Sequence, residues 1–151
     1  MRRFFVLAAA CASLLAVLLF GTPAQADVFI AVNKSTQSMS VVVDGRERYR
    51  WPVSTGLDGS PPSRAYQPER MERMWYSRKY DWSPMPHAIF FHYGFAIHGT
   101  GYVSRLGRPA SHGCVRLHPS HAAQLFALVR SEGMGRTRIV VTSSSRFAEQ
   151  R

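Results

Sequence analysis

The amino-acid sequence predicts a mostly β, single-domain fold in which one amphipathic helix packs on a sheet. Short runs rich in β-branched and aromatic residues recur along the chain, separated by Gly, Pro and Asp turn signals. One segment follows the i, i+3, i+4, i+7 apolar spacing of an amphipathic helix. The 151 residues, 46% of them hydrophobic, suffice for one domain with a buried core. They contain no internal repeat or second composition zone.

The first 26 residues are expected to be a secretory signal peptide. Arg2 and Arg3 precede an apolar run at 4–20, and Ala24-Gln25-Ala26 places small residues where signal peptidase needs them. We therefore expect cleavage near Ala26 and export to the periplasm or cell envelope. An uncleaved anchor stays open, because about 17–25 apolar residues span a bilayer. A lipoprotein signal at Cys11 fits only loosely.

The first half of the remaining chain predicts paired strands followed by a long loop. Asp44-Gly45 is a strong hairpin signal, and Pro52 indicates an edge strand or a strand end. Five Gly and Pro residues between 54 and 68 oppose regular structure there. The expected strands are 28–32, 39–43 and 47–53.

The second half predicts short strands around one helix. Ser120 is the expected helix cap, apolar residues at 122, 125, 126 and 129 form one face, and Gly133 ends the helix. Cys114 to Leu117 is expected to be extended or turning. The other expected elements are a strand within 71–80, a turn at 83–86, strands at 88–91 and 95–98, a loop from 99 to about 111, a strand at 139–141 and a polar tail at 143–151.

The net charge is +10, with 19 Lys and Arg against 9 Asp and Glu. No run of five or six basic residues occurs, so we do not expect nucleic acid as the partner. An acidic polymer, an anionic lipid surface or simple solubility remain compatible with the charge. Neither paired catalytic carboxylates nor a nucleotide-binding glycine pattern is apparent.

Removal of the leader would leave Cys114 as the single cysteine. Structural thiols of exported proteins are normally paired in an oxidising compartment. An unpaired thiol is therefore either buried and inert or reactive for a purpose, and composition alone leaves both readings open. The residues around Cys114 in the sequence distinguish the two readings.

Two clusters of residues could supply thiol chemistry: Ile97-His98-Gly99-Thr100 and, fourteen positions after His98, the segment Ser111 to Leu117. A nucleophilic thiol needs a nearby base and hydrogen-bond donors for the developing oxyanion. His98 could act as the base, and backbone N–H groups around Gly113 could act as the donors. Arg116 would point the same way as Cys114 in an extended segment, where it could lower the thiol pKa or hold a carboxylate.

Less specific readings remain beside this one. Spacing does not decide whether His98 or His112 takes the proton, and His112 could simply hydrogen-bond within its loop. Ser111 suits a loop-fixing hydroxyl better than a nucleophile. A zinc site built from Cys114 and the histidines at 98, 112 and 118 has suitable ligands but unusual spacing. A non-catalytic binding module with a decayed site is a further alternative.

The two clusters resemble the motif of the bacterial L,D-transpeptidases with a YkuD-type catalytic domain. The pattern is His98-Gly99-Thr100 followed by Ser111-His112-Gly113-Cys114-Val115-Arg116-Leu117. Upstream, residues 28–56 resemble the paired strands that open this domain, with Asp44-Gly45 and Pro52-Val53-Ser54-Thr55-Gly56. The resemblance covers about residues 27–142, and no other domain is expected.

The resemblance implies a β-sandwich-like catalytic fold and a role for each motif residue. Cys114 would be the nucleophile and His98 its base, with His112 as a third catalytic candidate. The pocket and oxyanion site would be formed by Gly113, Ser111, Gly99 and Thr100. Arg116 would contact the substrate. No metal or other cofactor is implied, and the oligomeric state is left open.

The implied reaction is acyl transfer on peptidoglycan stem peptides. The thiolate would attack the L-centre carbonyl of the third residue of a tetrapeptide stem, usually diaminopimelate, and D-alanine would leave. The amine of a second stem would resolve the thioester to give a 3→3 crosslink, whereas water would make the enzyme a carboxypeptidase. Carbapenem-type β-lactams are the expected inhibitors.

One segment departs from the family pattern. Members commonly carry Thr-Pro-x-Gly and an aromatic after the Ser-Thr-Gly segment, whereas this chain has Ser60-Pro61-Pro62-Ser63-Arg64-Ala65-Tyr66. The proline and the aromatic are kept and the glycine is lost. The loop beside the site, and with it the choice of acceptor, is therefore expected to differ.

Overall fold

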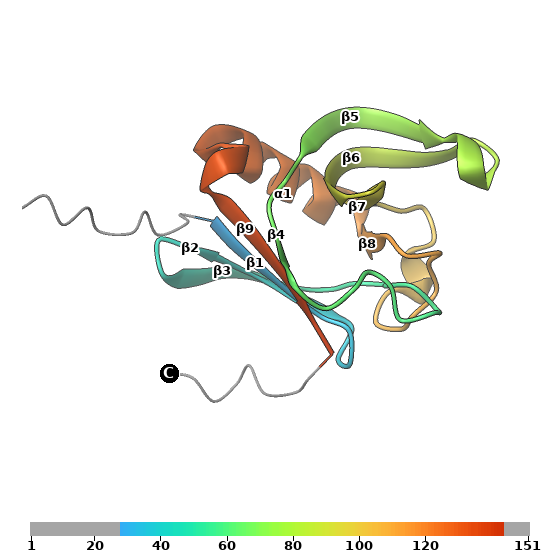
Figure 1. The fold of residues 1–151 in the computed structure, drawn as a ribbon, viewed down its shortest axis with the longest axis horizontal. Helices are drawn as coiled ribbons and strands as arrows, with labels where there is room; N and C mark the ends of the chain where they lie inside the picture. Colours follow the sequence, from blue (N-terminus) through green and yellow to red (C-terminus); the bar gives the residue numbers. More distant parts are fainter. Residues whose placement is uncertain (1–27, 144–151) are drawn as a thin grey trace, which may run out of the picture.

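The computed structural model describes residues 28–143, which form two sheets and one α-helix (Figure 1). The five-stranded sheet has the order β3 (Arg46–Pro52), β2 (Ser38–Val43), β1 (Val28–Asn33), β9 (Thr137–Thr142) and β4 (Ala65–Tyr66). The four-stranded sheet has the order β5 (Arg70–Ser77), β6 (Ser83–His92), β7 (Phe95–Gly99) and β8 (Val115–Leu117). The helix α1 spans Pro119–Glu132, and three 3₁₀ turns are η1 (Arg78–Tyr80), η2 (Val103–Arg105) and η3 (Met134–Arg136). The predicted mostly β fold is confirmed.

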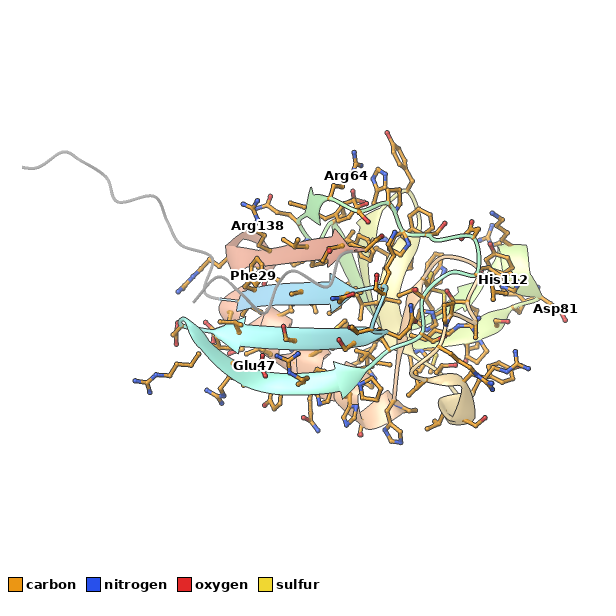
Figure 2. All side chains as sticks on the ribbon, turned by 90° about the horizontal axis from the view of Figure 1, so that it is seen from below. Phe29, Glu47, Arg64, Asp81, His112 and Arg138 are labelled. Carbon is orange, nitrogen blue, oxygen red and sulfur yellow. The ribbon has the colours of Figure 1, made fainter. Side chains whose placement is uncertain are left out.

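Strand β1 alternates buried and half-buried residues, as a strand with one covered face must. Val28, Ile30 and Val32 point into the core, whereas Phe29 and Arg138 lie on the outer face of the sheet (Figure 2). Antiparallel pairing joins β1 to β2 and β2 to β3, and β1 pairs with β9 in parallel. The Asp44-Gly45 hairpin and the edge position of β3 are confirmed.

The main core lies where the inner face of this sheet meets α1 and one face of the four-stranded sheet. Burial of these apolar side chains supplies most of the driving force for the fold. Its largest fully buried members are Phe91, Ile30, Met39, Ile89, Ile97, Leu117, Leu125 and Ile139. The apolar helix positions 122, 125, 126 and 129 are buried as predicted.

The opposite face of the four-stranded sheet carries a second, smaller apolar cluster. It consists of Met85, Ala88, Phe90 and Ala96, and Cys114 packs against it. The side chains of β6 and β7 therefore alternate between the main core and this cluster. Both faces of the sheet therefore carry buried apolar side chains, and the thiol packs against the smaller cluster.

The turn expected at 83–86 is wrong, because these residues begin β6 and pair with β5. Two prolines fit there because β7 pairs with β6 only from Ile89 onward, so this end of β6 has an open edge on that side. The chain reverses instead at η1 and at Asp81 and Trp82, which both have positive φ.

Two other boundaries differ from expectation. His118, not Ser120, caps α1: its side chain accepts a hydrogen bond from the Ser120 N–H, and Pro119 occupies the first turn, where a missing N–H does no harm. The segment 54–68, expected as loop, contains the two-residue strand β4, which pairs with β9. The start of the helix depends on an unusual capping residue, a histidine. The strand β4 depends on pairing with β9, which lies far along the chain.

The expected signal peptide and most of the expected polar tail lie outside the described residues. Within 28–143 no helix has the length and apolar character needed to cross a bilayer.

A first prediction concerns the turn between β6 and β7. Tyr93 and Gly94 both have positive φ, at 42° and 90°, and the Tyr93 side chain is 92% exposed. Asn adopts this conformation at lower cost than Tyr. Tyr93→Asn should therefore raise the free energy of unfolding by about 1 kcal/mol, measured by urea denaturation.

The reciprocal control is Asp44→Tyr in the β2–β3 turn, where Asp44 is exposed at φ 50°. This change should destabilise the protein by a similar amount. A Tyr93→Asn protein no more stable than the parent would contradict the assigned backbone strain.

Candidate active site

Cys114 directly precedes β8, and its half-buried side chain lies on the face of the smaller apolar cluster. Its Sγ donates a long hydrogen bond to the Gly94 carbonyl, with 3.9 Å between S and O. A backbone hydrogen bond from Ala96 also reaches the thiol. In this arrangement the sulfur is held against the start of β7.

The parallel pairing of β7 with β8 places the other candidates beside the thiol. Ile97 pairs with Val115 and His98 pairs with Arg116, so Ala96 lies next to Cys114. Residues two apart on a strand share a face. Cys114, His98 and Arg116 therefore lie on one face in two adjacent rows of the sheet. The structure thus brings together the three residues that the sequence analysis grouped.

His98 is only 6% exposed, and its Nδ1 lies 2.7 Å from the Gly99 carbonyl oxygen. A carbonyl can only accept, so Nδ1 is the protonated nitrogen and Nε2 keeps its lone pair. Burial lowers the pKa of His98 to about 4, the Gly99 carbonyl opposes this shift, and the positive charge of Arg116 adds to it. His98 is therefore a neutral imidazole at pH 7.

Burial raises the pKa of the Cys114 thiol above its ordinary value. The Ala96 hydrogen bond and the positive charge of Arg116 act in the opposite direction but do not overcome burial. Arg116 thus favours the thiolate and disfavours imidazolium. The resting site consists of a neutral thiol and a neutral imidazole, not a preformed ion pair.

The segment before Cys114 is held by the hydroxyl of Ser111. Ser111 Oγ donates to the Cys114 carbonyl at 2.6 Å and accepts from the Gly113 N–H at 3.0 Å. Both contacts agree with a loop-fixing hydroxyl. They also engage the Gly113 N–H, one of the predicted oxyanion donors, within the loop.

Gly113 adopts a φ of +128° in a space that no side chain could share. A Cβ added there would lie 2.4 Å from Phe95 Cε1 and 3.3 Å from Ser60 Cβ. Gly113 is therefore required both by its conformation and by the ring that covers it.

The atypical loop that begins at Ser60 is part of the site's support. The Gly56 N–H bonds to the Ser60 carbonyl at 2.9 Å, and the Leu57 N–H bonds to the Ser111 carbonyl at 3.1 Å. Lys34 Nζ donates to the Gly59 and Pro61 carbonyls at 2.5 and 2.8 Å. The loop without the family glycine thus connects β1 to the segment that carries the thiol.

His112 lies in a different environment from His98. It is exposed, and its ring stacks on Tyr80 of η1 with 4.6 Å between centroids. Figure 2 shows His112 on the same side of the molecule as Asp81, at the tip of the β5–β6 hairpin. The contact joins the hairpin tip to the thiol-bearing loop. A direct catalytic role for His112 stays a prediction.

The remaining predicted residues surround the end of β7. Thr100 N–H bonds to the Leu117 carbonyl at 2.9 Å, and its Oγ1 accepts from the Tyr102 N–H. A Cβ on Gly99 would lie 3.1 Å from Pro86. Arg116 Nη1 donates to the Ala110 carbonyl at 3.2 Å, and its guanidinium lies 5.9 Å from the Tyr102 ring.

The zinc alternative required four side chains to meet. Among residues 28–143 no three His, Cys, Asp or Glu side chains are grouped so that they could hold a metal ion. His118 caps α1 and His112 stacks on Tyr80, so two of the four take part in other contacts.

Sequence reasoning missed several residues outside the motif that contact the site. Gly94 and Ala96 meet the thiol, and Phe95 and Ser60 cover Gly113. The proximity of 94–96 to the motif residue His98 was the available signal. No sequence pattern near the motif indicates Ser60, because the position of Ser60 depends on Lys34 and on the bridge between Gly56 and Ser111.

A second prediction concerns Gly113. Gly113→Ala should lower the free energy of unfolding by about 2–4 kcal/mol, because the new methyl group is strained and meets Phe95. Urea denaturation measures this loss. Gly101→Ala is the matched control, since a Cβ there has no neighbour within 4 Å, and it should change stability by less than about 0.5 kcal/mol. Equal effects would refute the crowding.

A third prediction concerns the pH dependence that His98 imposes. Its folded pKa of about 4 lies below the ordinary 6.5, so the unfolded chain binds more protons between these values. The stability contributed by neutral His98 is complete above about pH 6.5 and should fall by about 3 kcal/mol on going to pH 4. Urea midpoints of the parent and of His98→Gln, compared from pH 7 to pH 4, isolate this contribution. Parallel pH curves would contradict it.

Comparisons with known proteins agree with this geometry. The model of the L,D-transpeptidase catalytic domain, YkuD, matches residues 27–141. YqjB of Bacillus subtilis (strain 168), named as an L,D-transpeptidase, is 25% identical over 142 residues, covering 85% of this chain and 78% of that protein.

Two solved structures share the fold. An L,D-transpeptidase from Stackebrandtia nassauensis is 26% identical with a TM-score of 0.67, covering 80% of this chain and 57% of that chain. L,D-transpeptidase 3 from Mycobacterium tuberculosis, in complex with a faropenem-derived adduct, is 20% identical with a TM-score of 0.66, covering 78% and 60%. This chain therefore spans less than two thirds of each solved chain. Because the family model matches residues 27–141, the chain belongs to the YkuD family of L,D-transpeptidase catalytic domains.

Proposed function

We propose that this protein is a cysteine-dependent L,D-transpeptidase that joins peptidoglycan stem peptides through a thioester on Cys114. The observation that carries the proposal is the placement of Cys114, His98 and Arg116 on one face in adjacent rows of β7 and β8. The tautomer of His98 supports it, because Nε2 is left free to accept a proton. No cofactor takes part in the proposed chemistry.

The first step activates the thiol. Cys114 points to the Gly94 carbonyl at rest, and we propose that rotation about its Cα–Cβ bond turns the sulfur toward the row of His98. Nε2 of His98 then accepts the thiol proton as the sulfur attacks. Because both groups are neutral at rest, the charge separation forms only with substrate in place, and Arg116 stabilises the thiolate.

In the acylation step the sulfur attacks the L-centre carbonyl of the third residue of a donor tetrapeptide. Backbone N–H groups at Cys114 and Gly113 are the proposed oxyanion donors. The Gly113 N–H would have to leave Ser111 Oγ, or share its proton with it, to contribute. The His98 imidazolium returns its proton to the departing amine, so D-alanine leaves and a thioester remains.

In the second step the side-chain amine of another stem attacks the thioester. Neutral His98 accepts the amine proton, the C–S bond breaks, and a 3→3 crosslink forms while the thiol is restored. Water in place of the amine would yield a tripeptide and make the protein an L,D-carboxypeptidase. Three exposed aromatic residues on the β5–β6 hairpin, Trp75, Tyr76 and Trp82, are the proposed contacts for this second peptide.

The place of action follows from the substrate. Residues 1–26, proposed as a cleaved signal peptide, would deliver the domain to the periplasm or cell envelope, where stem peptides are found. The excess of basic residues suits an anionic polymer. The alternative is a non-catalytic protein that binds the cell wall, and detection of turnover would exclude it.

The fourth prediction tests the thiol chemistry. Full-length wild-type protein, incubated with disaccharide-tetrapeptide, should release D-alanine and form a 3→3 dimer, and Cys114→Ala should form neither. Product masses with and without an added amine acceptor distinguish crosslinking from hydrolysis. Turnover by Cys114→Ala at the wild-type rate would end the proposal.

A β-lactam provides an independent readout of the same thiol. The solved relative from Mycobacterium tuberculosis carries a faropenem-derived adduct, and we propose that carbapenem-type β-lactams acylate Cys114 here. Intact-protein mass spectrometry should detect one adduct on the parent and none on Cys114→Ala. Ser111→Ala, which removes the loop hydroxyl but keeps the thiol, should still react, although more slowly.

A further inference from the structure

We propose that Arg70 binds a carboxylate of the donor stem peptide and so helps to select the substrate, an inference that rests on the function proposed above. The carboxylate is one that stays on the enzyme side of the scissile bond. It belongs either to the side chain of the third residue or to the residue that precedes it. The site is a guanidinium held over the apolar cluster beside the thiol.

Arg70 and Cys114 are the two ends of one row that crosses the four-stranded sheet. Arg70 on β5 pairs with Phe90 on β6, and Phe90 pairs with Ala96 on β7. Ala96 lies beside Cys114 and hydrogen-bonds to its thiol. Neighbouring strands lie about 4.8 Å apart, so the two backbones are about 14 Å apart.

The Arg70 side chain shortens this distance because it lies over the next strand. Its guanidinium carbon is 4.0 Å from the Phe90 ring centroid and 4.5 Å from that of Trp75. The cation is therefore near β6, about 10 Å from the strand that carries the thiol. Phe90 belongs to the cluster against which Cys114 packs, so cation and thiol share one face.

The two aromatic contacts hold the guanidinium while leaving hydrogen-bond donors available. Its side chain is 43% exposed, and Nη1 donates to Glu72 Oε1 at 2.7 Å. Among residues 28–143 this is the one hydrogen bond that the Arg70 side chain makes. The other N–H groups of the planar fork point at no protein acceptor, and stacked guanidinium groups bind carboxylates in fixed geometry.

The distance fits a carboxylate of the stem. A hydrogen-bonded carboxylate covers about 4 Å of the gap, which leaves about 6 Å to the strand that carries the thiol, and the bound carbonyl lies within this distance. Extended peptide spans about 3.3–3.6 Å per residue, so 6 Å is less than two residues. Diaminopimelate carries a second carboxyl at this range, and so does a γ-linked glutamate before it. The carboxylate of the leaving D-alanine lies closer to the sulfur.

The test measures donor binding and turnover separately. The variants are Arg70→Met, which keeps an apolar stem over Phe90, and Arg70→Lys, which keeps the charge but loses the fork. Arg73→Met is the matched control, because Arg73 is an exposed arginine of the same strand without a hydrogen bond or ion pair among the described residues. The donors are the tetrapeptide stem and two analogues, each amidated at one of the two carboxyls.

Arg70→Met should raise the KM of the unmodified donor about 10-fold or more and leave kcat within about twofold. Arg70→Lys should lie between the parent and Arg70→Met, and Arg73→Met should match the parent. Amidation of the contacted carboxyl should raise the parent's KM to that of Arg70→Met and have no further effect in the variant. The analogue that shows this loss of coupling identifies the carboxyl.

A KM effect of Arg70→Met that is the same for all three donors overturns the inference, as does an equal effect of Arg73→Met. Equal rates of carbapenem adduct formation on parent and variants establish that the thiol site is intact. Calorimetric binding of the same donors to Cys114→Ala, with and without Arg70→Met, separates the two proposals. Binding that depends on Arg70 without turnover by the parent would retain this inference and reject the transpeptidase.

Discussion

The parallel pairing of β7 with β8 is the constraint on which the site depends. These two short strands are connected by a loop rather than by a hairpin, and only their register places the row that holds His98 and Arg116 beside the row that holds Cys114. A shift by one residue would move Cys114 to the core face and bury it there. The register is held from both sides, because Ser54 pairs with Arg116 and Thr100 bonds to Leu117. The chemistry thus rests on a few backbone hydrogen bonds.

The surroundings of Cys114 and His98 keep both groups uncharged in the absence of substrate. Burial holds both groups neutral, and the single cation beside them opposes imidazolium while it favours thiolate. A free thiolate in an oxidising compartment would react with small disulfides and peroxides. In the proposed mechanism the thiol ionises only as a bound carbonyl is attacked, which would avoid this loss. The low pKa of His98 also keeps its imidazole neutral in mildly acidic surroundings.

Local signals predicted much of the fold. The β2–β3 hairpin followed from Asp44-Gly45, and α1 followed from its apolar face and Gly133. Cys114 and Arg116 were placed on one face correctly because an extended segment has only two faces, whereas His98 was assigned from the family resemblance and reaches this face through the pairing of β7 with β8. The errors at 83–86 and at the helix cap arose where pairing with β5, or the side chain of His118, overrode residue preferences. The orientation of His112 depends on Tyr80, 32 positions away, and no short-range pattern contains that contact.

The position of β9 has a consequence for synthesis. The last strand lies between β1 and β4, so a nascent chain lacks an interior member of its first sheet until residues 137–142 have left the ribosome. Until then, Lys34, which follows β1, and the loop that it anchors lack the complete sheet that supports them. A chain still in synthesis would therefore stay loosely folded, which would suit the export that we propose for it. The five-stranded sheet would be complete only after residues 137–142 have been synthesised.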